Sequence, residues 1–446
     1  MKIVIAGVGE VGSHLARMLG EEMHDITVID DDPKNIENIS GFSDIVTITG
    51  DATTFEALAK AEVSKANLFI AVGPVESKNI IAATLAKQLG AKKSIARIDN
   101  DEYLRPNNTE IFINMGIDYL FYPEMVAAEE VITLLGNTGT SEYVNFSGGK
   151  LSLVVFKLSS SSPLVDHTLA EMTDTDGGMS YRTVAISRKG KTIIPTGSEY
   201  FKEDDTIYII TDKKSMDELL ELSGRDNVKV RNMMILGGSK IGQRVALALQ
   251  NQVNVKLVDY NEEKAHKLAE MLDNTLVIAE DGRNTEVMIE EDLGGMDAFV
   301  AVTGRSETNI LAAMLAKKMG VKKVIVEIEN LNYISLAENM GVDTVINKKL
   351  TTASSIFRFT MNTDVQAIKC LNGCDAEVLE FIAKPDSPIT KGPLRDTHFP
   401  EGATIGGVVR GDKVFIAKGD TEIKAYDRVV VFSLPDAISK IGRFFI

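Results

Sequence analysis

The stretch Ile3-Val4-Ile5-Ala6-Gly7-Val8-Gly9-Glu10-Val11-Gly12 leads from a short apolar run into three glycines with the spacing Gly-x-Gly-x-x-Gly. This order is typical of a strand that turns into a helix and holds a dinucleotide pyrophosphate. Gly7 permits the tight turn, Gly9 lets the backbone approach the phosphates, and Gly12 lets the helix pack against the strand. The N–H groups at the start of the helix then attract phosphate charge.

An acidic residue stands where this fingerprint requires one. Asp30 ends the second apolar run, which covers residues 26–29. A carboxylate at that point accepts hydrogen bonds from the ribose hydroxyls and repels the additional phosphate of NADP. The sequence therefore predicts an NAD(H) site built from Asp30 and from the loop residues Gly7, Val8, Gly9, Glu10, Val11 and Gly12.

Small and polar residues follow the next three apolar runs. Asp51 and Ala52 come after the third run, and Asp51 is a candidate acceptor for an adenine amine. Gly73 and Pro74 come after the fourth run and leave room for a cofactor, while Arg97 lies near the end of the fifth run and suits a phosphate. Open α/β sheets bind ligands at the carboxyl ends of their strands, so we expect these residues in the same site.

The whole pattern occurs twice. The ten-residue stretch from Ile3 to Gly12 recurs as Met233-Met234-Ile235-Leu236-Gly237-Gly238-Ser239-Lys240-Ile241-Gly242. Later matches between the two halves of the chain keep an offset of between 225 and 230 residues. Such a constant offset over whole domains indicates a tandem repeat. It predicts a second nucleotide site at these residues: Gly237, Gly238, Ser239, Lys240, Ile241, Asp259, Asp281, Thr303 and Gly304.

Three substitutions distinguish the second copy from the first. Ser239 replaces Gly9, Glu280 replaces Gly50, and Glu327 replaces Arg97. The first adds a side chain near the phosphates and the other two add negative charge there, so we expect weaker phosphate binding in this copy. The alternative is that Lys240 or Arg305 supplies the missing cation.

The domain plan is large, small, large, small. In residues 1–120, six short apolar runs alternate with helical patterns, which predicts a parallel sheet with helical crossovers. The following segments read as strands over residues 151–158, 183–187 and 206–210, with a turn at Gly190-Lys191. The predicted fold class is α/β, with two Rossmann-like, doubly wound domains, each followed by a small α+β module. We place the domains at 1–135, 136–224, 225–360 and 361–446.

Composition narrows the cellular setting. The formal net charge is -16, which disfavours nucleic acid and anionic lipid as general partners. No stretch approaches the roughly 18 uninterrupted apolar residues of a membrane helix, and the first apolar run is too short for a signal peptide. We therefore expect a cytoplasmic protein. Cys370 and Cys374 are the only cysteines, and we expect packed thiols and no metal site.

The sequence shows no evident catalytic residue beside the predicted cofactor site. A dehydrogenase requires a proton donor or acceptor there, and none of the five histidines lies in a recognisable catalytic setting. Arg97 also has a structural alternative, an ion pair with Asp99 or Asp101. We expect a binding protein and not an enzyme.

Taken together, the two glycine loops, Asp30, Gly50-Asp51-Ala52-Thr53, Ala96-Arg97-Ile98 and the small strand-rich modules resemble the TrkA family. Its members are cytosolic nucleotide-binding regulators of Trk potassium uptake systems, built from domains of the RCK or KTN class. The resemblance implies a homo-oligomeric ring bound peripherally to a membrane potassium translocator at the inner face of the membrane. It also implies NAD(H) and ATP or ADP as competing ligands, held by the residues named above.

Two other functions compete with this interpretation. An NAD-dependent oxidoreductase would share the fold and would show hydride transfer with some substrate. A transcriptional or redox sensor would also share it but requires a DNA-binding module, which the sequence does not show and the acidic charge disfavours.

Overall fold

The computed structural model describes residues 1–21, 24–42, 45–175, 181–222, 228–357, 359–360, 365–371, 374 and 376–446. The predicted domain boundary between residues 224 and 225 lies outside the described residues. The chain forms two compact units. One consists of Met1–Val126 with Lys348–Thr360, and the other of Ala127–Asn347 with Met361–Ile446.

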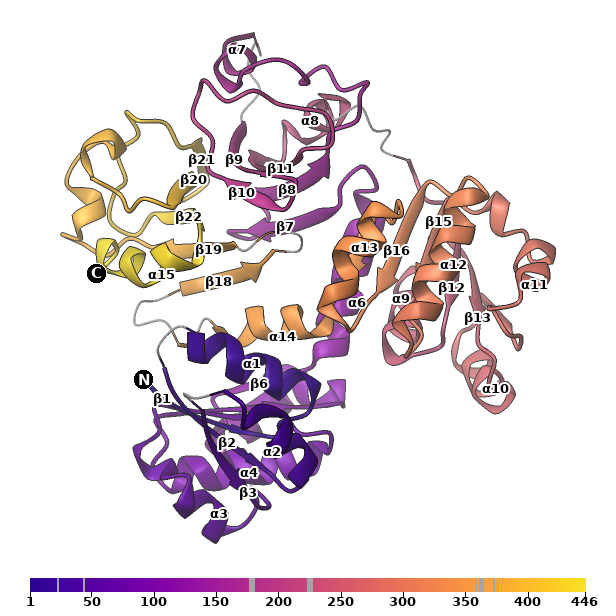
Figure 1. Ribbon diagram of the computed structural model, residues 1–446, viewed down its shortest axis with the longest axis vertical. Coiled ribbons are helices and arrows are strands. Elements are labelled where there is room, and N and C mark those ends of the chain that lie inside the picture. The colour runs from indigo at the N-terminus through magenta and orange to yellow at the C-terminus, as the bar shows by residue number, and fades with distance from the viewer. Residues whose placement is uncertain are drawn as a thin grey trace. The chain divides into compact units, whose positions relative to one another are not determined.

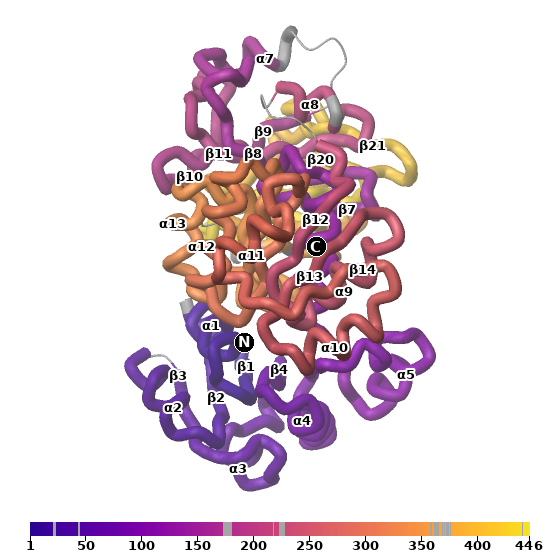
Figure 2. The backbone as a smooth tube through the Cα atoms, turned by 90° about the vertical axis from the view of Figure 1, so that its right-hand side faces the viewer, coloured from indigo at the N-terminus to yellow at the C-terminus, as the bar shows by residue number. Residues whose placement is uncertain are grey.

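The first unit contains a six-stranded parallel sheet with the order β3-β2-β1-β4-β5-β6. This order is that of a doubly wound Rossmann sheet, and all six predicted strands are present. The strands are β1 (Lys2–Ala6), β2 (Asp25–Asp30), β3 (Ile45–Thr49), β4 (Leu68–Ala71), β5 (Lys93–Arg97) and β6 (Tyr119–Phe121). The helices between them are α1 (Glu10–Glu21), α2 (Pro33–Ile39), α3 (Phe55–Lys60), α4 (Glu76–Gln88) and α5 (Pro106–Asn114) (Figures 1 and 2).

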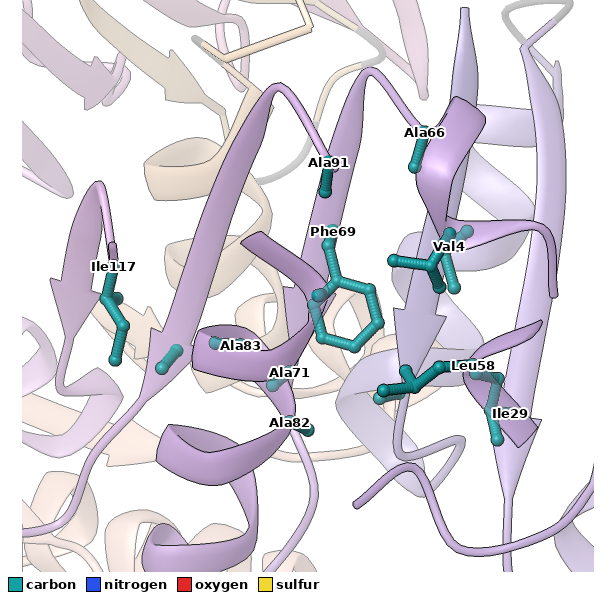
Figure 3. Packing of buried hydrophobic residues seen from close by; sticks show 14 of the residues in the cluster. Val4, Ile29, Leu58, Ala66, Phe69, Ala71, Ala82, Ala83, Ala91 and Ile117 are labelled. Atoms are coloured by element: carbon teal, nitrogen blue, oxygen red, sulfur yellow. The ribbon is translucent and has the colours of Figure 1, made fainter. Parts of the chain in front are cut away.

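The core of this sheet follows from its composition. The central strands β1 and β4 are apolar and buried over residues 3–6 and 68–71, as expected for parallel strands covered on both faces. Figure 3 shows Val4 of β1 and Phe69 of β4 among the buried side chains, together with Ala82 and Ala83 of α4. The helix therefore faces the sheet with alanines, which allow a close approach. Ile81 of the same helix is instead 49% exposed.

The second unit repeats this architecture. Its parallel sheet has the order β14-β13-β12-β15-β16-β17, which matches the first sheet strand for strand. Its strands are β12 (Asn232–Leu236), β13 (Asn254–Val258), β14 (Thr275–Ile278), β15 (Ala298–Ala301), β16 (Lys323–Glu327) and β17 (Thr344–Ile346). Its helices are α9 (Lys240–Leu249), α10 (Glu262–Met271), α11 (Thr285–Glu290), α12 (Ser306–Lys318) and α13 (Ile334–Asn339).

Two helices change places between the repeats. Helix α6 (Pro123–Gly136) follows the first sheet, yet its buried residues from Ala127 to Leu135 belong to the core of the second sheet. Helix α14 (Lys348–Phe357) follows the second sheet, yet it packs against α1. Beyond it, the ring of Phe359 contacts that of Tyr119 of β6 in a tilted arrangement, with ring centroids 5.1 Å apart. The sequence repeat alone did not predict this exchange.

Each small module is a five-stranded antiparallel sheet with short helices, which confirms the predicted α+β class. The first has the order β10-β9-β11-β8-β7 and the second β18-β19-β22-β20-β21, and the two sheets share a hydrophobic core. The first consists of β7 (Glu142–Phe146), β8 (Leu151–Lys157), α7 (Leu169–Thr175), β9 (Tyr181–Arg188), β10 (Lys191–Ile193), β11 (Thr206–Asp212) and α8 (Met216–Leu222). The second consists of β18 (Val365–Cys370), β19 (Glu377–Ile382), β20 (Ala403–Arg410), β21 (Lys413–Ile416), β22 (Arg428–Ser433) and α15 (Pro435–Ile441).

The same ion pair stabilises both small modules. Arg188 donates to Asp205 at 2.8 Å, and Arg410 donates to Asp427 at 2.7 Å. Both aspartates are almost completely buried, so the pairing guanidinium offsets the cost of their burial. The two small modules are therefore repeats in side-chain chemistry as well as in topology.

Candidate functional site

The glycine loop of the first copy lies at the carboxyl end of β1, against the loop that follows β4. Gly7 has φ of +91°, and a side chain on it would lie 2.5 Å from the Cα of Gly73. A side chain on Gly12 would overlap the carbonyl oxygen of Gly7. A side chain on Gly9 would meet nothing within 4 Å. The fold itself therefore requires Gly7 and Gly12, whereas Gly9 faces open space of the kind that an approaching ligand needs.

Asp30 at the end of β2 is tied to this loop. Its carboxylate accepts from the N–H of Val8 at 2.5 Å, from the N–H of Asp32 at 2.8 Å and from the side-chain amide of Asn35 at 3.2 Å. The side chain is buried. These hydrogen bonds hold the carboxylate beside the glycine loop, at the point where a ribose would contact it.

Asp51, after β3, takes part in a second network. Its carboxylate accepts from the N–H and the hydroxyl of Thr53, and it lies 2.9 Å from the ammonium of Lys78. The same ammonium lies 2.9 Å from Asp31. The hydrogen bond from the Thr53 N–H and then the Lys78 ammonium lower the pKa of Asp51 to about 2, and these two aspartates raise the pKa of Lys78. Neither Asp31 nor Lys78 was among the predicted site residues.

Asn79 organises one side of the first crevice, by which we mean the region at the carboxyl ends of β1 and β4 where sheets of this order bind their ligands. Its side-chain oxygen accepts from the N–H of Gly73 at 2.9 Å, and its amide donates to the carbonyls of Gly73 and Arg97 at 2.9 and 3.0 Å. In the same turn of α4, Glu76 accepts from the N–H groups of Asp99 and Asn100. One helical turn thus fixes the loops after β4 and β5. The repeat of Asn79 as Asn309 was the signal in the sequence that could have identified it.

Arg97 lies at the end of β5 but is already engaged with carboxylates. Its guanidinium is 3.2 Å from Glu124 and 3.4 Å from Asp99. Its Nε is buried and has no hydrogen-bond partner among the described residues. Pairing with Asp99 was the structural alternative to phosphate binding, and this ion pair is present together with a second one to Glu124. Glu10 in the glycine loop is exposed and pairs with Lys349 of α14. Of the other predicted residues, Val11 lies in the first turn of α1, while Ala52 and Pro74 lie in the loops that follow β3 and β4.

The second copy has the same framework with different side chains. Gly237 has φ of +104° and packs against Thr303, and Gly238 donates to Asp259 at 2.8 Å. Asp259 also lies 2.8 Å from the ammonium of Lys264. Burial alone would raise the pKa of Asp259, but the hydrogen bonds from Lys264 and from two backbone N–H groups outweigh it and lower the pKa. Lys264, on α10, was not among the predicted site residues.

Two differences bear on phosphate binding in this copy. The hydroxyl of Ser239 accepts from the N–H of Gly242 at 3.3 Å and so caps the helix whose N–H groups a phosphate would use. Glu327, which replaces Arg97, is buried on β16. Asp281 is paired with Arg283 of its own loop at 2.6 Å. The remaining predicted residues, Lys240, Ile241 and Gly304, lie at the starts of α9 and of the loop after β15.

His14 is mostly buried on α1, and burial, then Arg17 and Lys349, lower its pKa to about 4. Cys374 is a half-buried thiol packed against the core that the small modules share, while the side chain of Cys370 lies outside the described residues. Within the described ranges, no group of three His, Cys, Asp or Glu side chains is arranged to hold a metal ion.

Comparison with known proteins agrees with this architecture. Residues 3–123 and 233–348 match the TrkA-N domain family, and residues 153–224 and 378–446 match the TrkA-C domain family. The chain is 31% identical to the "Trk system potassium uptake protein TrkA homolog 1" of Methanosarcina mazei, with both chains covered completely. It is 32% identical to the "Trk system potassium uptake protein TrkA" of Vibrio alginolyticus, over 97% of this chain and 95% of that one.

Solved structures share the fold at lower identity. The structure titled "Crystal Structure of the GsuK RCK domain" covers the whole chain with a TM-score of 0.62 and 15% identity. The "GsuK channel bound to NAD" also covers the whole chain, together with 78% of its own length, with a TM-score of 0.61. The structure titled "Crystal structure of the GsuK bound to ADP" covers 80% of this chain with a TM-score of 0.51. At these identities the similarity establishes the fold.

Proposed function

The chain belongs to the TrkA family, and from that premise we propose that it is a regulatory subunit that senses nucleotides and gates a Trk-type membrane potassium transporter. The proposal rests on the geometry of the first crevice. There, buried Asp30 is bonded to the glycine loop and the open side of Gly9 faces away from the protein. A relative of the same fold is titled as bound to NAD and another as bound to ADP, which supports nucleotides as the ligand class.

In this proposal the first copy holds NAD(H) or an adenine nucleotide at one overlapping site. The glycine loop from Gly7 to Gly12 receives the phosphates at the start of α1, and Asp30 receives the ribose. Asp51 and Ala52 border the adenine. Gly73 and Pro74 line the opposite wall, and Arg97 contributes a cation to a polyphosphate. The residues of the second copy form a weaker site, because Ser239 uses a helix N–H and Glu327 replaces the cation.

We propose that the protein regulates and does not catalyse. The curated relatives are named as potassium uptake proteins, although the Rossmann fold is shared with oxidoreductases. A ligand can gate a partner only through different affinities for two conformations. NAD(H) and ATP or ADP, competing for one crevice, would stabilise different conformations. The exchanged helices α6 and α14 are suitable connections, because each joins one nucleotide-binding sheet to the other repeat.

The proposed assembly is a homo-oligomer that docks on the inner face of the membrane. Matching positions of the two copies expose large apolar side chains, as in Ile81 and Leu311, Ile111 and Leu336, and Met115 and Met340. Exposed apolar groups that recur at equivalent helices suit contacts between subunits. Among the described residues, no helix is long and apolar enough to cross a membrane. Membrane association would therefore depend on the translocator. Along the sequence we place the four domains at 1–135, 136–224, 225–360 and 361–446, with α6 and α14 exchanged between the two nucleotide-binding sheets.

Reconstitution tests the function directly. The full chain is added to proteoliposomes that contain a Trk-type translocator from the same cells, and potassium flux is measured with no nucleotide, with NADH and with ATP. We expect flux that depends on the chain and differs between the two ligands. A potassium flux that is the same without nucleotide, with NADH and with ATP would contradict gating by nucleotides. Turnover of NADH with a panel of carbonyl and hydroxy substrates would instead favour the oxidoreductase.

A further inference from the structure

One ion-pair cross-link spans the first crevice. Lys78 extends from the first turn of α4, and its ammonium lies 2.9 Å from both Asp31 and Asp51. In the sheet order, β4 lies on one side of β1, whereas β2 and β3 lie on the other. Asp31 follows β2 and Asp51 follows β3, so the cross-link passes over the carboxyl end of β1. This is the switch point at which such sheets bind their ligands.

The second copy keeps the surrounding contacts but not this one. Asn309 bonds the loops after β15 and β16 just as Asn79 bonds the loops after β4 and β5. The residue before Asn309 is Thr308, which replaces Lys78 and cannot form an ion pair. Tyr260 follows Asp259 where Asp31 follows Asp30, and Asp281 is bonded to Arg283 of its own loop. The cross-link over the crevice is therefore a specific property of the first copy.

The ion pairs of Lys78 are weak enough to break and re-form repeatedly. The side chains of Lys78, Asp31 and Asp51 are 47%, 60% and 35% exposed. Ion pairs at this exposure are individually weak, and salt screens them. Because one ammonium serves two carboxylates from different loops, however, both contacts must break before the adenosine end of the crevice opens fully. Asp51 remains ionised well below neutral pH, so this closure persists across the physiological range.

We propose that Lys78 is a strap over the adenosine end of the first crevice, which an adenine nucleotide must open to enter and which closes again over the bound nucleotide. The inference rests on the proposed function, since it assumes that the nucleotide occupies this crevice. Its consequence is kinetic. The strap slows association and dissociation together and leaves the affinity nearly unchanged, so the first copy exchanges its ligand more slowly than the second.

Stopped-flow fluorescence with mant-ADP on the full chain tests the strap. The variant Lys78→Thr installs the residue that the second copy has, and Asp31→Asn removes one carboxylate partner. The kinetic phase that Asp30→Ala weakens and Asp259→Ala leaves in place reports the first site. In that phase we expect both rate constants of Lys78→Thr to rise by roughly 3- to 10-fold, as expected for the loss of two exposed ion pairs. Added salt should accelerate the wild-type protein more than the variant.

The controls separate the strap from other roles of Lys78. Lys60→Thr removes an equal charge from an exposed pair with Glu56 on α3 and should leave the rates unchanged. The double variant of Lys78→Thr with Asp31→Asn should behave like Lys78→Thr alone, because both changes open the same closure. An increase in the dissociation rate alone would make Lys78 an ordinary ligand contact and overturn the strap, as would unchanged rates. Absence of mant-ADP binding to the wild-type chain would overturn the proposed function itself.

Discussion

The side-chain amide of Asn79 donates a hydrogen bond to the carbonyl oxygen of Arg97 over 3.0 Å, and Asn309 donates to the carbonyl of Glu327 over 2.8 Å. Arg97 and Glu327 have side chains of opposite charge, yet the hydrogen bond is the same because its acceptor is the backbone carbonyl. Each asparagine also bonds the loop after the preceding strand, at Gly73 or Thr303. The framework of the crevice is therefore independent of the side chains that distinguish the two copies.

Removal of this amide should loosen the first crevice. In Asn79→Ala, the N–H of Gly73 and the carbonyls of Gly73 and Arg97 lose a buried partner, which should reduce the free energy of unfolding by about 1–3 kcal/mol. Denaturant unfolding checks this value, and NADH titration should show weaker binding. Asn309→Ala is the matched variant, with a similar loss of stability and a smaller effect on NADH. Unchanged NADH affinity in Asn79→Ala would mean that this loop does not contact the ligand.

Arg97 should discriminate between ligands by their phosphate charge. A guanidinium at the end of β5 favours a polyphosphate over the neutral nicotinamide end of NADH, so Arg97→Ala should weaken ATP binding more than NADH binding. Calorimetric titration of both ligands into the full chain measures the two losses. Arg105→Ala, an exposed cation paired only with Glu102 in the described part of the chain, is the control. Equal losses for both ligands would assign Arg97 to its ion pairs with Glu124 and Asp99.

The lowered pKa of His14 predicts how the free energy of unfolding changes with pH. Burial, and then Arg17 and Lys349, lower the pKa of His14 from 6.5 to about 4 in the folded state. The unfolded chain therefore binds an additional proton between these pH values, so stability falls as the pH drops through this window. From pH 7 to pH 5 the loss should be about 2 kcal/mol from this group.

Denaturant unfolding of wild type and of His14→Leu at the two pH values isolates this contribution. The leucine variant should lose less stability on acidification, since its side chain cannot titrate. His266→Gln, at an exposed position of α10, should follow the wild-type protein. Parallel pH dependence of wild type and His14→Leu would show that His14 is not the group that responds to acidification.

The sequence predicted the fold because its signals are local. Apolar runs at Ile3–Ala6 and their repeat near Ile235 are followed at once by glycines that the turns require, and φ of +91° at Gly7 is a conformation that other residues rarely adopt. The exchange of α6 and α14 could not be predicted in this way. Both helices are apolar on a face that either sheet could bury, so the choice depends on tertiary packing.

The candidate site was predicted only in part for a related reason. Asp30 and Asp51 carry a signal because they stand at fixed distances from apolar runs. Lys78 and Lys264 lie on helices, where a charged residue is usually a solvated surface residue, and only the folded chain brings them to Asp51 and Asp259. Even so, Asn79 was visible in the repeat, and its conserved position in both copies was the available signal.

The last prediction concerns the inequality of the two nucleotide sites. Dividing the chain between residues 225 and 226 would not test it, because that cut removes α14 from the first sheet and α6 from the second. Single substitutions in the full chain are the better comparison. Asp30→Ala should weaken NADH binding by about 1–3 kcal/mol, since hydrogen bonds to a charged group are lost. Asp259→Ala is its matched counterpart in the second copy.

We expect Asp259→Ala to change the tight binding of NADH and ATP much less than Asp30→Ala. Asp259 is already occupied by the ammonium of Lys264, Ser239 caps the helix that a phosphate would approach, and Glu327 adds a buried carboxylate. Calorimetry on the full chain gives both affinities, and denaturant unfolding shows whether either variant is simply less stable. A larger loss in Asp259→Ala would mean that Lys264 supplies the cation missing from the second copy. The ranking of the two sites would then be reversed, with the second copy as the main sensor.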